Sequence, residues 1–135
     1  MMNQLIIFFH NFDKYKNNTY QELYHHLMPS INLNQYKIFE DSKGIYGFVN
    51  WARLNNTDEE YYTKTGSLNK NQWNSGKKLW LYDIVILRKA KEVMRWVYNY
   101  FKGYLRTNES INWLRLDKQN NIYRIGKKYK REFHN

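Results

Sequence analysis

The sequence LWLYDIVIL occupies residues 79–87 and decides the fold. Apolar residues fall on both alternating faces of this stretch, which is typical of a strand in the middle of a sheet that is covered on both sides. Residues 88–104 follow with apolar and aromatic side chains at helical spacing, and residues 111–117 have the character of another strand. We therefore expect a β-α-β crossover, in which a helix joins two parallel strands.

The N-terminal part of the chain predicts two helices and a hairpin. A second helical segment over residues 20–28 is expected to end near Pro29, because the residue before a proline is disfavoured in a helix. Residues 36–40 and 45–51 flank a turn-rich loop and predict a β-hairpin. The first helix is indicated by four apolar residues at helical spacing: Leu5, Phe8, Phe9 and Phe12.

Shorter elements are expected on either side of the crossover. Thr57 and Glu60 have the spacing of a capping box and predict a helix over about residues 58–65, which Gly66 can end. Residues 122–125 predict a last strand after a turn at 118–121. The whole pattern is that of an α+β fold, with N-terminal helices and a mixed central sheet in one domain of residues 1–135.

Length and composition exclude several classes of protein. A chain of 135 residues can form one domain with a sizeable core, but not an enzyme with a separate cofactor-binding domain. The sequence has no Cys, which excludes disulfides, a thiolate nucleophile and a cysteine metal site. The four His lack metal-ligand spacing and no phosphate-binding glycine loop is present, so neither a metal nor a bound cofactor is expected. Because we find no secretory signal and no membrane-spanning stretch, we expect a cytoplasmic protein.

The charge balance predicts an anionic partner. The chain has 22 Lys and Arg against 12 Asp and Glu, a formal charge of +10. By composition alone the partner is a nucleic acid, an anionic membrane surface or an acidic protein. Basic clusters occur at Lys77-Lys78, at Arg88-Lys89 and between Arg124 and Arg131. The second lies at a helix start, where cations oppose the helix dipole. Two interpretations of this cluster stay open: a solvated surface, and a role in holding an anion.

Asp83 is the polar residue that stands out in the central strand. Strict alternation would place it on one face with Leu79, Leu81, Val85 and Leu87. A carboxylate buried there is costly unless it is paired or takes part in chemistry. Two interpretations stay open: a buried salt bridge, for which Arg115 on the next strand is the natural partner, and a catalytic or orienting carboxylate.

The histidines carry less information. His10 lies beside the apolar stripe of the first helix and is interpreted as a surface residue, with a general base as the alternative. His25 and His26 lie in the second helix, where Leu23 and Leu27 define the buried face. We expect at least one of this pair to be exposed and interpret the pair as structural.

Two strings in the middle of the chain resemble a known family. They are GFVNWARL at residues 47–54 and QWNSGKKLWLYD at residues 72–83. In this order and separation they resemble the toxin-activating lysine acyltransferases of the hemolysin C type. Met28-Pro29, Asn34-Gln35-Tyr36 and Leu114-Arg115-Leu116-Asp117 also follow that pattern. The similarity covers roughly residues 5–120.

The resemblance implies a fold and an activity. The fold would be similar to that of the GNAT acyltransferases, and the activity would move a fatty acyl chain from acyl carrier protein to internal lysines of an RTX protoxin. Acyl carrier protein would be a co-substrate rather than a bound cofactor. Given the resemblance, the positive charge of this chain is better interpreted as a docking surface for this acidic protein than as a nucleic-acid-binding surface. A homodimer is left open.

The resemblance also implies site residues. In the family a His of the N-terminal helical region acts as the base, together with the Asp of the W-x-x-D string, which is Asp83 here. In an alignment without gaps the His position falls on Tyr15, and His10 is the other candidate for the base. The cations that we expect to bind the donor are Arg115, Lys77, Lys78, Arg88 and Lys89. The alternatives are a catalytically inactive homologue that binds acyl carrier protein or toxin, and a basic nucleic-acid-binding module.

Overall fold

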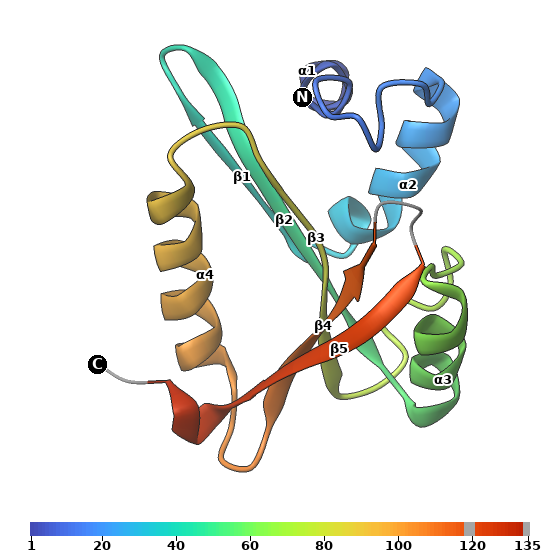
Figure 1. The fold of residues 1–135 in the computed structure, drawn as a ribbon, viewed down its shortest axis with the longest axis vertical. Helices are drawn as coiled ribbons and strands as arrows, with labels where there is room; N and C mark the ends of the chain where they lie inside the picture. Colours follow the sequence, from blue (N-terminus) through green and yellow to red (C-terminus); the bar gives the residue numbers. More distant parts are fainter. Residues whose placement is uncertain (118–120, 134–135) are drawn as a thin grey trace.

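A five-stranded sheet separates two groups of helices in the computed structural model, which describes residues 1–117 and 121–133 (Figure 1). The strands lie in chain order in the sheet: β1 (Tyr36–Asp41), β2 (Gly44–Leu54), β3 (Lys78–Ile86), β4 (Ser110–Leu116) and β5 (Ile122–Tyr129). The helices are α1 (Met2–Phe9), α2 (Tyr20–Asn32), α3 (Asn56–Thr65) and α4 (Ala90–Tyr104), followed by a short 3-10 helix, Lys130–Glu132. This arrangement confirms the expected α+β, GNAT-like fold with a mixed sheet.

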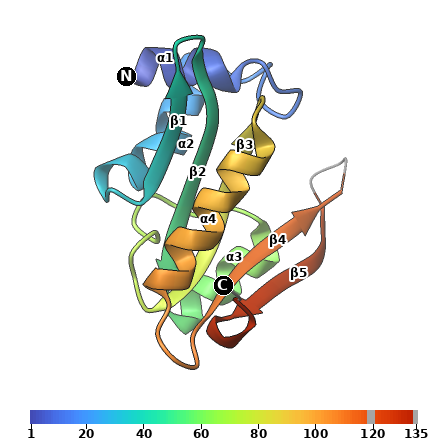
Figure 2. The ribbon, with the colours of Figure 1, turned by 90° about the vertical axis from the view of Figure 1, so that its left-hand side faces the viewer.

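The crossover is formed as predicted, but its two strands soon diverge. β3 and β4 are parallel and are joined by α4, whereas the other neighbouring strands are antiparallel. The parallel pairing joins only residues 79–81 of β3 to residues 111–113 of β4. Beyond these residues β4 and β5 turn away from the first three strands (Figure 2). The sheet is therefore open beside the C-terminal half of β3.

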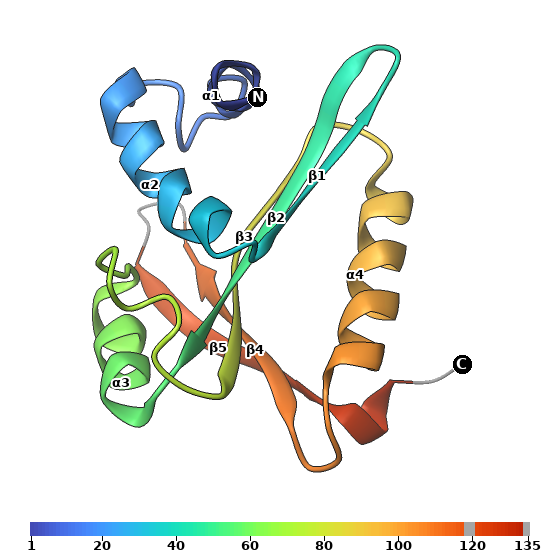
Figure 3. The ribbon, with the colours of Figure 1, turned by 180° about the vertical axis from the view of Figure 1, so that it is seen from behind.

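Each face of the sheet is covered by helices. α4 packs on one face, and α1, α2 and α3 lie on the other (Figure 3). The apolar spacing predicted for α4 is confirmed, because Val93, Val97 and Phe101 are buried against Trp51 and Leu81 of the sheet. The opposite face has two clusters: α1 and α2 bury Leu5, Phe9, Leu23 and Leu27 together with Phe48 and Val85, and α3 buries Tyr62 beside Trp73 and Trp80.

The predicted end of the second helix is wrong. α2 runs through Pro29 to Asn32, because the turn after the proline is held by contacts outside the helix. The amide of Gln35 donates to the carbonyl of Ser30 at 2.8 Å, and the Gln35 side chain donates to the carbonyls of Trp51 and Trp73 at 2.9 and 3.1 Å. These bonds offset the loss of the one backbone donor that proline lacks.

The third helix begins earlier than predicted. Its N-cap is Asn55, whose side chain accepts from the amide of Asp58 at 2.7 Å, so Thr57 lies inside the helix. Gly66 ends the helix in the left-handed conformation at φ 77°, as expected.

The described residues contain no helix that is both long and apolar enough to cross a membrane. Most of the turn predicted at 118–121 lies outside these residues. The strand expected at 122–125 is confirmed and extends to Tyr129.

Candidate functional site

A β-bulge in β3 determines the direction of Asp83. Asn50 of β2 pairs with Asp83, but the next residue, Trp51, pairs with Leu81. Tyr82 is therefore an extra residue in β3, and the Asn50 side chain accepts a hydrogen bond from the Asp83 amide at 2.7 Å. A bulge of this kind shifts the alternation of side chains by one position.

The shift moves Asp83 to the face of α1 and α2. Leu79 and Leu81 belong to the core under α4, whereas Val85 packs with α1 and α2. Asp83 also faces α1 and α2, because its carboxylate contacts residues from the N-terminal segment and from α2. The expectation that all these residues share one face is thus wrong, since strict alternation does not hold across the bulge.

The Asp83 carboxylate is bound on both oxygens. The Tyr15 hydroxyl donates to Oδ1 at 2.7 Å, and His26 Nε2 lies 2.7 Å from Oδ2. Asp83 is only 4% exposed, and the His26 side chain is 25% exposed. Arg115, which we expected as the partner in a buried salt bridge, is exposed, and His26 pairs with Asp83 instead.

The two charged forms of the pair stabilise each other. Burial by itself would raise the pKa of Asp83, but the charge and hydrogen bond of His26, with the Tyr15 hydrogen bond, hold it below the ordinary value. Burial likewise opposes the charged form of His26, yet the Asp83 carboxylate raises the pKa of the imidazole above its ordinary value. The arrangement is an aspartate that orients an imidazole and increases its basicity.

Tyr15 is placed as a donor to this carboxylate. Burial raises the pKa of its hydroxyl, and the neighbouring Asp83 charge raises it further. The phenol therefore stays protonated and gives its hydrogen bond to Asp83. This state favours an orienting role for Tyr15 over the role of a base.

Aromatic rings pack around the pair and bury most of it. The His26 ring lies 5.5 Å from the Tyr15 ring, 5.7 Å from the Tyr82 ring and 6.4 Å from the Phe9 ring, measured between centroids. Tyr82 in turn packs on Trp73, with centroids 4.4 Å apart. Such surroundings strengthen the electrostatic interaction between Asp83 and His26.

Two cavities meet at Asp83. The larger, about 650 Å³, lies where β3 and β4 diverge and extends under α4 to Val97 and Phe101. The smaller, about 400 Å³, is lined by His26 and by Thr65, Gly66 and Ser67 at the end of α3. Both are lined by the same six residues at their junction: Lys14, Tyr15, Tyr82, Asp83, Leu114 and Leu116.

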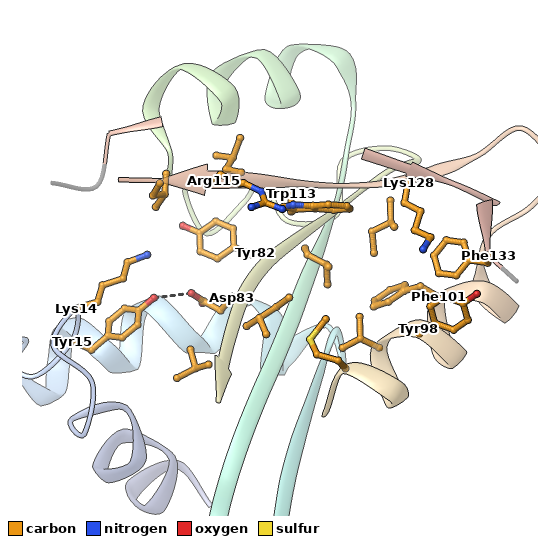
Figure 4. Close-up of a pocket in the computed structure, with 18 residues that line it drawn as sticks. Lys14, Tyr15, Tyr82, Asp83, Tyr98, Phe101, Trp113, Arg115, Lys128 and Phe133 are labelled. Carbon is orange, nitrogen blue, oxygen red and sulfur yellow. Dashed lines mark hydrogen bonds between the residues drawn. The ribbon is translucent and has the colours of Figure 1, made fainter. Parts of the chain in front are cut away.

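The larger cavity is mostly apolar and has cations at its edge. Figure 4 shows Trp113 and Phe101 inside it, with Lys14, Arg115 and Lys128 around them. Its lining includes no carboxylate except Asp83 among the residues described. This combination suits an apolar chain that carries a polar or anionic end.

The predicted base candidates are separated by the structure. Tyr15 contacts Asp83, whereas the exposed His10 places Nε2 3.0 Å from the carbonyl oxygen of Asn18 and lines neither cavity. The structure thus brings two of the three predicted catalytic residues together.

The predicted donor-binding cations are also scattered. Arg115 lines the larger cavity. Arg88 and Lys89 hold an anion, as their position suggested, but this anion is the Asp41 carboxylate, at 2.6 and 2.8 Å. Lys78 pairs with Glu59 at 3.1 Å, and neither it nor the exposed Lys77 lines the cavities at Asp83.

His26 is the residue that sequence reasoning missed. The pair His25-His26 was interpreted as structural, whereas the structure places His26 against Asp83 and leaves His25 exposed. A signal was present, because His26 follows Leu23 by three residues, a spacing that places both side chains on one face of the helix.

Comparison with known proteins shows the family of this chain. The family model described as the RTX toxin acyltransferase family, HlyC, matches residues 1–130. The chain belongs to this family. The chain is 35% identical over 98 residues to the uncharacterized protein sll0720 of Synechocystis sp.. The matched region covers 69% of this chain and 63% of that protein.

The name of a second relative of this chain states an activity. The RTX-II toxin-activating lysine-acyltransferase ApxIIC of Actinobacillus pleuropneumoniae is 27% identical over 84 residues, covering 62% of this chain and 52% of that protein. The matches thus span about half to just under two thirds of the length of these relatives.

Proposed function

We propose that this member of the RTX toxin acyltransferase family is a protein-lysine fatty acyltransferase, which moves an acyl chain from acyl carrier protein to lysines of an RTX-type protoxin. The observation that carries the proposal is the His26–Asp83 pair at the junction of an apolar and a more polar cavity. Amide formation from a thioester needs these three parts: a base, a site for the chain and access for an amine.

His26 would act as the general base. An acceptor lysine has an ordinary pKa of about 10.4 and must lose a proton before it can attack. With Nε2 bound to Asp83, Nδ1 of the neutral imidazole can accept that proton, and the resulting imidazolium is stabilised by the carboxylate. Tyr15 and Asn50 would keep the carboxylate in position, through its Oδ1 atom and through the backbone amide.

The reaction would follow the course of an ordinary acyl transfer. The amine nitrogen forms a bond to the thioester carbonyl carbon, and the carbonyl oxygen becomes negative. The intermediate collapses with cleavage of the carbon–sulfur bond, and the thiolate leaves and takes up a proton. Lys14 at the junction is a cation available to the developing negative charge.

The larger cavity would hold the donor. Its apolar lining between β3, β4 and α4 suits the acyl chain, and exposed Ile84 and Met94 continue the apolar surface at its edge. Arg115 and Lys128 would face the anionic arm of the carrier. The net charge of +10 would favour encounter with an acidic carrier protein.

The test is a transfer assay read by mass. The protein is incubated with carrier protein loaded with a long-chain acyl group and with a lysine-rich protoxin fragment. We expect the mass of one acyl chain on the fragment, and a loss of about 100-fold or more with Asp83→Asn. Absence of any adduct at high protein concentration would instead indicate an inactive homologue. Binding of DNA or RNA with a steep salt dependence would favour the nucleic-acid module.

A further inference from the structure

Lys14 lies at the junction of the two cavities, although the proposed reaction assigns it no covalent part. It belongs to the segment between α1 and α2 and lines both the apolar and the polar cavity. Figure 4 shows its side chain beside Tyr15 and Asp83, with the amine at the cavity. An acceptor lysine would have to bring its own amine to the same junction.

Two further observations place the Lys14 amine close to the reacting groups. Its Nζ atom lies 5.4 Å from the centroid of the Tyr15 ring. Its charge also acts on both members of the pair, lowering the pKa of Asp83 and opposing the charged form of His26. In the described part of the chain no carboxylate forms an ion pair with Lys14, so the amine is not held away from the junction.

Lys16 lies in the same segment and is exposed like Lys14, but its contacts differ. Its Nζ atom lies 3.5 Å from the Asp13 carboxylate. It lines neither cavity at Asp83. Lys16 is therefore a matched reference for the reactivity of an ordinary surface lysine in this segment.

We propose that Lys14 is a self-acylation site, which accepts the acyl group from a thioester donor in the larger cavity when no acceptor lysine occupies the junction. The inference rests on the proposed function, because it uses the same donor and the same base. The Lys14 amine gives a proton to His26, its nitrogen bonds to the acyl carbon, and the carbon–sulfur bond breaks. The thiol leaves with a proton, and an amide is formed.

The modification would stop further turnover. The amide removes the positive charge of Lys14 and tethers an apolar chain that fits the larger cavity next to it. A second donor could then not place its chain there. Self-acylation would thus limit activity when donor is abundant and acceptor is scarce.

Peptide mapping by mass spectrometry tests the proposal. The full chain is incubated with carrier protein loaded with a saturated long-chain acyl group, without acceptor, and is then digested. We expect the acyl group on Lys14 at about ten times or more the level on Lys16, because only Lys14 is held next to the donor. Lys14→Arg should abolish this adduct, whereas Lys16→Arg should leave it unchanged.

A second readout concerns activity. Preincubation with the donor alone should lower later transfer to a protoxin fragment, measured against the same variant without preincubation. This relative loss should disappear in Lys14→Arg but persist in Lys16→Arg. Equal labelling of Lys14 and Lys16 would overturn the inference.

The same reactions test the proposed transfer to the protoxin fragment independently of self-acylation. Acylation of the fragment without any adduct on Lys14 would overturn self-acylation and leave the proposed function standing. An adduct on Lys14 without transfer to the fragment would support self-acylation and contradict the protoxin as acceptor. If neither is labelled, both proposals fail.

Discussion

The imidazole at the site is that of His26 and does not come from position 15, where alignment with the family places a histidine. Tyr15 stands where the family resemblance implies a histidine, and His26 reaches Asp83 from α2. Both side chains bind the same carboxylate, one on each oxygen. A base can therefore be supplied from α2 while Tyr15 keeps a positioning role.

Removal of the Tyr15 hydroxyl separates these two roles. Tyr15→Phe keeps the ring and deletes the hydrogen bond to Asp83 Oδ1. We expect a free energy of unfolding lower by about 1.5–3 kcal/mol, because the bond is buried and its acceptor is charged. Transfer should fall by about tenfold, since His26 still has its carboxylate partner. A loss as complete as that in Asp83→Asn would identify Tyr15 as the base instead.

The Asp83–His26 pair also predicts a pH dependence of stability. The pKa of His26 is raised and that of Asp83 is lowered in the folded chain. The pair thus contributes fully between the unfolded pKa values of about 3.9 and 6.5, and its contribution declines as pH rises through the raised pKa of His26 or falls through the lowered pKa of Asp83.

Chemical denaturation at several pH values measures this contribution. The difference in unfolding free energy between the wild type and His26→Gln should be largest at about pH 4–6.5 and should shrink above that range. A difference that does not change with pH would contradict the ion pair.

Individual site residues could be predicted from sequence where a residue interrupts the hydrophobic pattern of its element. Asp83 stands out because a carboxylate interrupts an apolar strand. Tyr15, 68 residues away in the chain, was implied only by the family resemblance, and His26, 57 residues away, was not predicted as a partner. Arg115 was expected from the neighbouring strand, but β3 and β4 have already diverged at Asp83.

At the scale of elements, the bulge in β3 and the segment before it set the geometry of the site. The extra residue Tyr82 turns Asp83 toward α2. The string WNSG at residues 73–76 holds the chain against the end of β2. The amide of Arg53 donates to the carbonyl of Trp73 at 2.9 Å, and the amide of Ser75 donates to the carbonyl of Arg53 at 2.8 Å. The string that marks the family is therefore structural in this chain.

Gly76 is the position in this string where a side chain cannot fit. A Cβ there would lie 2.5 Å from the backbone nitrogen of Asn55, whereas a Cβ at Gly103 in α4 would meet nothing within 4 Å. We expect Gly76→Ala to lower the unfolding free energy by about 1–3 kcal/mol or more, because backbone must move. Gly103→Ala should change it by less than about 1 kcal/mol and in the stabilising direction. Equal melting temperatures for the two variants would contradict this account of the string.

The elements were predicted well from sequence, and their ends less well. Periodicity was sufficient for α4, because its apolar residues face one large core, and the turn signal between two apolar runs was sufficient for the hairpin. The passage of α2 through Pro29 depends on hydrogen bonds to Gln35, and the bulge depends on Asn50, so neither follows from local pattern. Both features arise from contacts between segments that are distant in sequence.

At the scale of the whole molecule, some of the excess cations pair with carboxylates of the chain and others line the larger cavity. Arg88 and Lys89 are used internally by Asp41, and Lys78 by Glu59. Lys14, Arg115 and Lys128 line the larger cavity. Acidic carrier protein would thus meet cations at the opening where the proposed donor enters.

Ionic strength should control the encounter with the carrier. We expect the second-order rate constant for transfer from acyl carrier protein to fall as salt is raised, because screening weakens attraction over about 8–10 Å at 0.1–0.15 M salt. A small neutral thioester with the same acyl chain serves as the control and should show little salt dependence. Equal salt dependence for both donors would argue against charge-guided docking.

The proposed acyl transfer depends most on His26 as the base. The most direct measurement is kcat/KM for transfer to a lysine acceptor as a function of pH, with His25→Gln on the exposed side of the same helix as the control for His26→Gln. In the wild type and in His25→Gln, kcat/KM should rise through a pKa above 6.5, as the raised pKa of His26 requires. In His26→Gln it should be about 100-fold lower and should rise only toward the pKa of the acceptor lysine, near 10.4. An unchanged profile in His26→Gln would contradict the account.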